Sequence, residues 1–130
     1  MHYNFVYMVN VLVVEDDIVL CLLTRKNIEL MGHKVVAVAT RGAEAIAAVK
    51  KYKPDVILMD IFLEGDSDGI NTMHEIAKFD DVPAIYFTSG LEKTNEARAA
   101  ETNMLAFYTK PINFGELEAT LNNIEKRARA

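Results

Sequence analysis

The sequence predicts an α/β fold in which five βα units form one open, doubly wound sheet with helices on both faces. Two patterns alternate along its 130 residues: short runs rich in β-branched residues, and longer segments whose apolar residues recur every three or four positions. Several short runs are apolar at nearly every position, as expected for parallel strands covered on both faces. Because a closed barrel would need eight units, five units indicate an open sheet.

The short runs are predicted to be the strands of this sheet. Each run is about as long as an average strand, and turn-forming residues such as Gly32 and Pro54 separate several of them from the preceding segments. In chain order the predicted strands are Val9–Val14, Lys34–Val38, Asp55–Met59, Ala84–Phe87 and Leu105–Thr109.

The longer segments are predicted to be helices, and the last of them has the clearest signals. Asn113 stands at its N-cap position and Glu116 follows three residues later, which is the spacing of a capping box. One apolar stripe runs along it, made of Phe114, Leu117, Leu121 and Ile124. In chain order the predicted helices are Ile18–Met31, Gly42–Tyr52, Ile70–Phe79, Leu91–Thr102 and Phe114–Arg127.

Composition excludes several classes of protein. A net charge of −5 has the wrong sign for a broad contact with nucleic-acid phosphates. The single cysteine, Cys21, forms neither an internal disulfide nor a zinc site, and no apolar stretch reaches the length of a membrane span. The first ten residues contain no Lys or Arg for a signal peptide. We therefore expect one domain over residues 1–130, in the cytoplasm, without direct contact with nucleic acid or membrane.

Reactive side chains gather just after the predicted strands. In a doubly wound sheet, ligands bind at the carboxyl ends of the strands, so these residues are expected to share one rim. They are Glu15, Asp16 and Asp17 after the first strand, Asp60 after the third, Thr88 and Ser89 after the fourth, and Lys110 with Pro111 after the fifth.

These groups are suited to phosphoryl transfer. Carboxylates of Asp16 and Asp60 on neighbouring strands would repel by roughly 3 kcal/mol at about 5 Å, so a cation is expected between them, and hard oxygen ligands favour Mg²⁺. Lys110 and Thr88 offer an ammonium and a hydroxyl to phosphoryl oxygens. Asp60 is the best nucleophile of the rim, because a carboxylate can form an acyl phosphate.

Four blocks of the chain resemble the receiver domain of bacterial-type two-component response regulators. The resemblance covers about Val9 to Arg127, with the blocks in order at suitable spacings. The blocks are Val-Leu-Val-Val-Glu15-Asp16-Asp17, Val-Ile-Leu-Met-Asp60, Tyr-Phe-Thr88-Ser89 and Phe107-Tyr-Thr-Lys110-Pro111. It implies a flavodoxin-like sheet of five parallel strands in the order 2-1-3-4-5.

The resemblance also assigns roles to the rim. It implies that Asp60 is the phosphoacceptor and that Lys110, whose peptide bond to Pro111 is expected to be cis, contacts the phosphoryl oxygens. It further implies a Mg²⁺ site. The expected metal ligands are Asp16, Asp60 and the backbone carbonyl of Phe62, with Glu15 assisting through water.

A switch and a set of partners follow from the same resemblance. Thr88 is expected to move toward the phosphoryl group and free space into which Phe107 turns, which reshapes the surface of the fourth helix, fifth strand and fifth helix. The implied donor is a sensor histidine kinase or a histidine phosphotransfer protein, and the implied reader is a downstream protein or an output domain. A homodimer through this surface is compatible with the resemblance. The only implied catalysis is self-catalysed phosphorylation and dephosphorylation.

Two features depart from the family pattern. The loop over residues 61–69 is one residue longer than usual, lacks a common proline and is acidic, and Phe107 replaces a more usual tyrosine. Residues 64–75 also nearly fit a twelve-residue calcium loop, but that motif needs a helix before it, and Asp55–Leu63 is predicted to be a strand.

Three other functions compete with the switch. An aspartate-nucleophile phosphatase of the haloacid dehalogenase type needs a second Asp two residues after the nucleophile, where this chain has Phe62. A flavin-binding module needs hydroxyl and backbone donors after the first strand, where this chain has three acids. A degenerate receiver that binds partners constitutively is the third alternative, although all four key positions are intact.

Overall fold

A computed structural model describes residues 7–63, 65, 67–90 and 93–124 of the chain. Its strands are β1 (Asn10–Val14), β2 (Lys34–Ala39), β3 (Val56–Asp60), β4 (Ala84–Thr88) and β5 (Met104–Thr109). Its helices are α1 (Ile18–Leu30), α2 (Gly42–Tyr52), α3 (Gly69–Ile76), α4 (Lys93–Ala100) and α5 (Phe114–Asn122).

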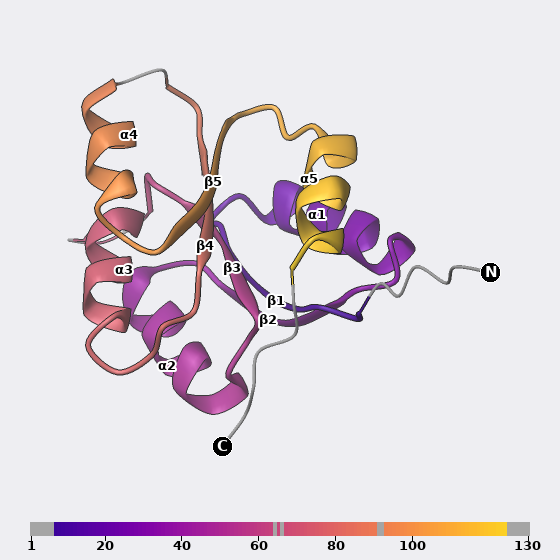
Figure 1. The fold of residues 1–130 in the computed structure, drawn as a ribbon, viewed down its shortest axis with the longest axis horizontal. Helices are drawn as coiled ribbons and strands as arrows, with labels where there is room; N and C mark the ends of the chain where they lie inside the picture. Colours follow the sequence, from indigo (N-terminus) through magenta and orange to yellow (C-terminus); the bar gives the residue numbers. More distant parts are fainter. Residues whose placement is uncertain (1–6, 64, 66, 91–92, 125–130) are drawn as a thin grey trace.

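All five strands lie parallel in one sheet, in the order β2-β1-β3-β4-β5 (Figure 1). This confirms both the doubly wound fold and the strand order that the resemblance implies. The order reverses direction beside β1, so the ends of β1 and β3 lie next to each other. A ligand site at the carboxyl end of the sheet is therefore expected between these two strands.

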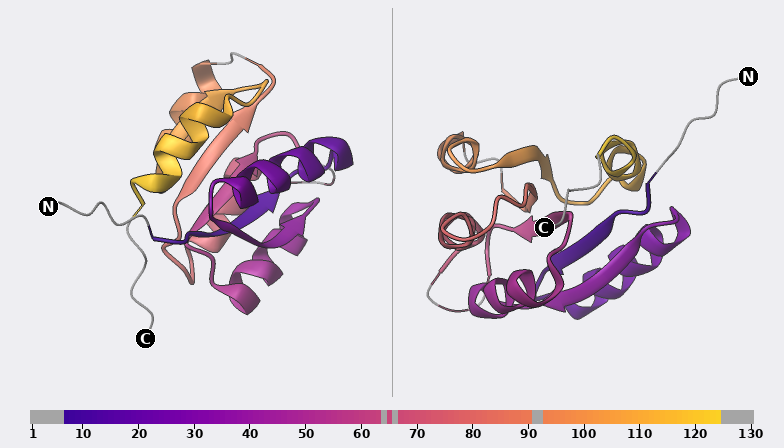
Figure 2. Two further views of the ribbon diagram at one scale, coloured as in Figure 1. Left: turned by 90° about the vertical axis from the view of Figure 1, so that its right-hand side faces the viewer. Right: turned by 60° about the horizontal axis from the view of Figure 1, so that its bottom comes forward.

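Helices cover both faces of the sheet and create two apolar cores. Helices α1 and α5 lie on one face, and α2, α3 and α4 lie on the other (Figure 2). Successive residues of β1 alternate between the cores: Val11 and Val13 pack under α1 and α5, whereas Leu12 and Val14 pack under the other three helices. This alternation explains why the strands are apolar at nearly every position.

Several predicted boundaries are wrong by a few residues, and local bonds explain the differences at the ends of the helices. Strand β3 includes Asp60, whose backbone is in register with Phe87 of β4, so the proposed nucleophile belongs to the sheet itself. Helix α3 ends at Ile76 instead of Phe79, because the amides that follow make short i to i−3 bonds such as Phe79 N–H to Ile76 O.

Helices α4 and α5 also end earlier than predicted, and the predicted start of α4 at residues 91–92 lies outside the described residues. After α4, the hydroxyl and amide of Thr102 both donate to the carbonyl of Ala99, which closes the helix. Helix α5 ends at Asn122, with the N–H of Asn123 bonded to Thr120 O, and the predicted extension over residues 125–127 lies outside the described residues. The start of α5 is as predicted, since Asn113 Oδ1 accepts the Glu116 N–H at 3.1 Å.

The beginning of α3 is held tightly against the end of β3. The Gly69 N–H donates to the carbonyl of Ile61 at 2.7 Å, and Asp68 caps the helix by accepting the Asn71 N–H at 2.8 Å. The other carboxylate oxygen of Asp68 lies 2.9 Å from Nη2 of Arg98 in α4. A strand precedes this loop instead of the helix that a calcium loop requires, and Asp68 serves as a cap; both observations disfavour the calcium-loop alternative, of which residues 64 and 66 lie outside the described part of the chain.

None of the described helices combines the length and apolarity needed to span a membrane.

We predict that Gly69→Ala destabilises the fold by about 1–3 kcal/mol, because a Cβ at this position would overlap the carbonyl oxygen of Asp60 and lie 2.7 Å from Cγ of Met59. Gly90→Ala is the matched control, since a Cβ there meets open space. Urea unfolding of the two variants measures the difference. Equal midpoints and slopes would contradict the tight packing of α3 on β3.

Candidate functional site

The predicted rim residues do come together at the carboxyl end of the sheet. Backbone bonds continue past the strands, with Glu15 N–H donating to Ala39 O at 2.9 Å and Lys110 N–H donating to Thr88 O at 2.8 Å. These bonds hold in place the backbone of Glu15, the first residue after β1, and of Lys110, the first residue after β5. The Lys110–Pro111 peptide is cis, as the resemblance implies.

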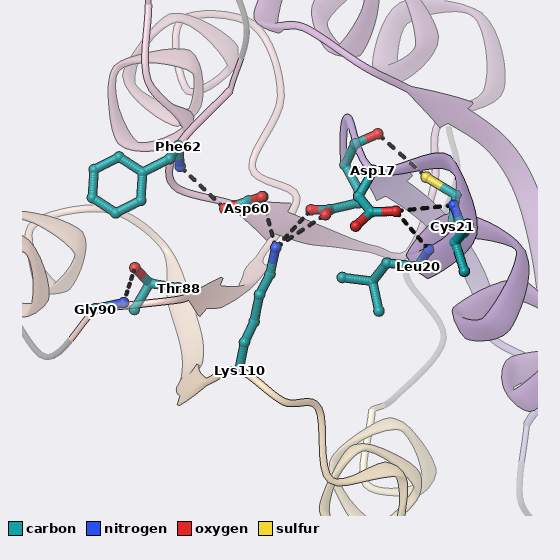
Figure 3. A network of polar contacts seen from close by, with 10 residues as sticks. Asp17, Leu20, Cys21, Asp60, Phe62, Thr88, Gly90 and Lys110 are labelled. Atoms are coloured by element: carbon teal, nitrogen blue, oxygen red, sulfur yellow. Dashed lines mark hydrogen bonds and ion pairs between the residues drawn. The ribbon is translucent and has the colours of Figure 1, made fainter.

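The Lys110 ammonium lies between two buried carboxylates. Its Nζ is 2.9 Å from Oδ2 of Asp60, and 3.0 and 3.1 Å from the two oxygens of Glu15. In Figure 3 the Lys110 side chain extends from the end of β5 across to Asp60. Glu15 is only 5% exposed and Asp60 only 6%. Lys110 is therefore the positive charge that offsets the repulsion between these acids, a contact that the sequence analysis did not assign.

Asp60 uses both of its oxygens. While Oδ2 accepts from Lys110, Oδ1 accepts the backbone N–H of Phe62 at 3.1 Å (Figure 3). This bond turns the chain sharply after β3 and keeps the Phe62 backbone beside the carboxylate. Phe62 itself is 49% exposed.

Burial and neighbouring charges change the acidity of this cluster. Burial, together with the hydrogen bond and negative charge of Asp60, raises the pKa of Glu15 from 4.5 to about 7, although Lys110 opposes the rise. Burial alone would lower the pKa of Lys110, but its contacts with Asp60 and Glu15 outweigh burial and raise that pKa. Lys110 therefore stays charged at neutral pH.

Asp16 completes a group of three acids with the composition of a metal site. Glu15, Asp16 and Asp60 each have an oxygen within 4.8 Å of an oxygen of the other two, and Asp16 is exposed while the others are buried. Asp17 is set apart, because its Oδ1 caps α1 by accepting the Val19 and Leu20 amides. Of the three acids after β1, Glu15 and Asp16 therefore belong to the cluster, whereas Asp17 caps helix α1.

Thr88 and Phe107 lie on the β4–β5 side of the site. Thr88 is 1% exposed, and its hydroxyl accepts the Gly90 N–H at 3.3 Å (Figure 3). Phe107 is partly buried, and its ring centroid lies 6.3 Å from that of Tyr86 in β4. Tyr86 in turn is fully buried and hydrogen-bonded to Thr102 just after α4. Phe107 therefore stands between the interior and the surface beside α4.

An exposed group of apolar side chains beside the rim is not predicted from the sequence. Helix α1 begins at the acidic cluster and exposes five large apolar side chains, with exposed fractions of 49–76%. They are Ile18, Val19, Leu22, Leu23 and Leu30. Apolar periodicity alone gives no sign of this surface, because α1 is apolar on more than one side and only three of its residues, Cys21, Thr24 and Ile28, are buried.

Together these residues have the composition of a site for a cation and an anion. Three carboxylates and one ammonium leave a formal excess of two negative charges when all are ionised. Hard oxygen donors with this charge suit a divalent ion such as Mg²⁺. The ammonium beside Asp60 is suited to an anionic group transferred to that carboxylate.

Comparison with known proteins identifies a family over most of this chain. The family model of the response regulator receiver domain matches residues 11–122. The transcriptional regulatory protein ZraR of Klebsiella oxytoca is 31% identical over 115 residues, which are 88% of this chain and 26% of that protein. The chemotaxis protein CheY of Thermotoga maritima is 29% identical over 117 residues, which are 89% of this chain and 97% of that protein.

Solved structures are similar as well. The signal receiver domain of a modulated diguanylate cyclase from Desulfovibrio desulfuricans G20 superposes with a TM-score of 0.83 at 29% identity, covering 91% of this chain and 94% of that one. The response regulator domain of Thermotoga maritima CheB superposes with a TM-score of 0.77, also at 29% identity, covering 88% and 91%. The chain spans about a quarter of ZraR but nearly all of CheY.

We predict that Glu15→Gln stabilises the metal-free protein at neutral pH. Folded Glu15 holds its proton up to about pH 7, whereas an unfolded glutamate releases it near 4.5, so the wild-type unfolding free energy falls as the pH rises between these values. A shift of this size corresponds to at most about 3 kcal/mol. Urea unfolding in EDTA from pH 4.5 to 8 measures the effect.

In that experiment the advantage of Glu15→Gln over wild type should grow with pH and vanish below about pH 4.5. Glu101→Gln, at an exposed position, should follow the wild type at every pH. A constant difference between Glu15→Gln and wild type across the range would contradict the raised pKa.

Proposed function

Since the chain belongs to the family of response regulator receiver domains, we propose that it is a phosphorylation-controlled switch whose phosphoacceptor is Asp60. The observation that carries this proposal is the bond between Lys110 Nζ and Asp60 Oδ2, inside a cluster of acids at the carboxyl end of the sheet. In this proposal residues 1–130 form one receiver domain with a core over about 9–127, which acts in the cytoplasm.

The donor set of the rim fits Mg²⁺. Asp16 and Asp60 would hold the ion together with the Phe62 backbone carbonyl, and Glu15 would assist through water. The exposure of Asp16 supports this role, since it leaves one side of the cluster open to a hydrated ion. When bound, Mg²⁺ supplies positive charge that offsets the carboxylates and the oxygens of an incoming phosphoryl group.

Asp60 would act as the nucleophile. One carboxylate oxygen forms a bond to phosphorus while the N–P bond of a phosphohistidine on the donor breaks. The bonding electron pair stays with the donor imidazole, which takes up a proton. Lys110 already contacts the attacking carboxylate and would contact a phosphoryl oxygen in the product, so it would help to orient the group and offset its charge.

The phosphoryl group would then change the surface at α4, β5 and α5. In this mechanism the buried Thr88 hydroxyl leaves the Gly90 amide for a phosphoryl oxygen, and the Phe107 ring turns into the space that is freed. The partial burial of Phe107 and its contact with Tyr86 support this path, because both rings lie under α4. Phe107 has no hydroxyl that could hold the inward orientation.

The exposed apolar side of α1 supports protein partners for this switch. Large apolar side chains exposed together next to a reactive site are typical of an interaction surface. The donor would be a sensor histidine kinase or a histidine phosphotransfer protein that packs on α1 while its phosphohistidine reaches Asp60. A downstream protein or output domain would bind the surface of α4, β5 and α5 after it has changed. A homodimer would use the same surface.

A degenerate receiver that binds partners constitutively is the main alternative, and an aspartate-nucleophile phosphatase is a weaker one. The contact of Lys110 with Asp60 favours a competent receiver. Phe62 stands at the position where such a phosphatase needs its second aspartate, which argues against phosphatase activity.

We predict that acetyl phosphate with Mg²⁺ adds one phosphoryl group to the wild type and none to Asp60→Asn, because the amide is not a nucleophile of this kind. Intact-mass spectrometry measures the addition. Asp16→Ala should reduce it by at least about tenfold through weaker Mg²⁺ binding. Equal labelling of wild type and Asp60→Asn would refute the proposal, and no labelling of the wild type would favour the degenerate receiver.

We further predict that Lys110→Ala still binds Mg²⁺, at least about threefold more tightly, because one positive charge beside the acids is removed. The same variant should lose the response of α4, β5 and α5 to beryllofluoride, a phosphoryl mimic. Amide chemical shifts report both effects, with Lys34→Ala at an exposed site as control. A full response in Lys110→Ala would contradict the role of the ammonium.

A further inference from the structure

We propose that residues 1–6 of this chain pack along the exposed apolar side of α1 and shield it from the protein that donates the phosphoryl group. These residues lie outside the described part of the chain, whereas the surface that they would cover and the point where they join the domain are described. The shielding rests on the proposed function, because that function places the donor on α1. The packing itself does not depend on it.

The exposed apolar side of α1 extends over the whole helix. Its five large side chains are exposed, and spacings of four or seven residues place them in two adjoining stripes. The outer turns of the helix form an open groove of about 380 Å³. A soluble surface normally carries such side chains singly, so this group calls for a cover. The stripes are Ile18 with Leu22, and Val19 with Leu23 and Leu30.

The chain enters the domain beside the last turn of α1. The Val9 N–H donates to Nδ1 of His33 at 3.0 Å, and His33 follows Leu30, the last residue of α1, by only three positions. Tyr7 and Met8, which come just before Val9, are exposed. Residues 1–6 are therefore attached at one end of the surface that they would cover.

The length and the sequence of this segment match the surface. Six residues in extended conformation span about 20 Å, and the thirteen residues of α1 also rise about 20 Å. The segment could therefore reach from the end of α1 back to its first turn, next to the acidic rim.

The pattern of apolar residues in the segment points the same way. Met1, Tyr3 and Phe5 stand at alternate positions, so an extended segment would present all three on one side. Residues 1–6 contain no Asp, Glu, Lys or Arg, whose hydration would oppose packing on an apolar surface. One side of the segment is thus suited to the leucines of α1.

Attachment to the domain favours this segment over a separate protein as the cover of α1. A segment that is tethered at the edge of a surface has a high effective concentration there, so modest apolar contacts suffice to hold it. A protein donor that packs on α1 to reach Asp60 would have to displace the segment first. A small donor such as acetyl phosphate needs no contact with α1 and would not be slowed.

Nuclear Overhauser effects between rings and leucine methyl groups test the packing directly. In protein with ¹³C-labelled leucine methyl groups, the rings of Tyr3 and Phe5 should show such effects to Leu22, Leu23 or Leu30. Labelled chains with deuterated rings, mixed with unlabelled chains, should show none, because the contact lies within one chain. Persistence of the effects in the mixture would assign the contact to a second copy and overturn the proposal.

The fluorescent probe 1-anilinonaphthalene-8-sulfonate, which binds exposed apolar surface, measures the shielding. The double variant Tyr3→Ser, Phe5→Ser should bind the probe at least about threefold more strongly than wild type, because it lacks the covering rings. The matched control His2→Ser, Asn4→Ser changes the intervening positions and should behave as wild type. Adding Leu22→Gln to the first variant should remove most of the increase, which would locate the probe on α1.

The outcomes separate this inference from the proposed function. Equal probe binding by wild type and the Tyr3, Phe5 variant, an equal increase in the control, or absent ring effects at α1 would each overturn the packing. Acetyl phosphate with Mg²⁺ should label Asp60 equally in wild type and both segment variants. Ring contacts without any labelling would support the packing but refute the switch and the shielding of its donor, while labelling without ring contacts would refute the packing alone.

Discussion

The contact of the Lys110 ammonium with Glu15 and Asp60 is the interaction on which the site depends. Two carboxylates with exposed fractions of only 5% and 6% stand at the ends of adjacent strands, where their repulsion would be costly without a cation. The cation comes from the end of β5, two strands away from β3, and only a long side chain can cross β4 to reach Asp60. The strand order therefore decides which two acids lie side by side, and it decides which strand supplies the ammonium between them.

The same balance of charge suits the site to a reversible signal. One ammonium does not neutralise three carboxylates, so the charge of the rim suits the divalent ion proposed there. If the carboxylates held Mg²⁺, Lys110 would be free to contact an incoming phosphoryl group. The proposed switch thus exchanges one set of ionic contacts for another, while the buried backbone of β3 and β4 stays in register.

Much of this fold was predictable because parallel strands covered on both faces leave a strong apolar pattern, and the rim followed from which residues end those strands. The ends of α3 and α4 were not predictable, since bonds such as Phe79 N–H to Ile76 O decide them locally. The direct contact of Glu15 with Lys110 also escaped prediction, because it depends on how far a side chain reaches across β4. The exposed apolar side of α1 was not predictable for a different reason, because periodicity does not reveal which side of an apolar helix is covered.

A crystal structure with Mg²⁺ and beryllofluoride tests the central claim most directly. The account predicts beryllium on an oxygen of Asp60, Mg²⁺ on Asp16 and Asp60, and the Lys110 ammonium moved from Glu15 onto a fluorine. Density for beryllofluoride at any other residue, or a Lys110 that keeps its bonds to Glu15 while Asp60 carries the fluoride, would contradict it.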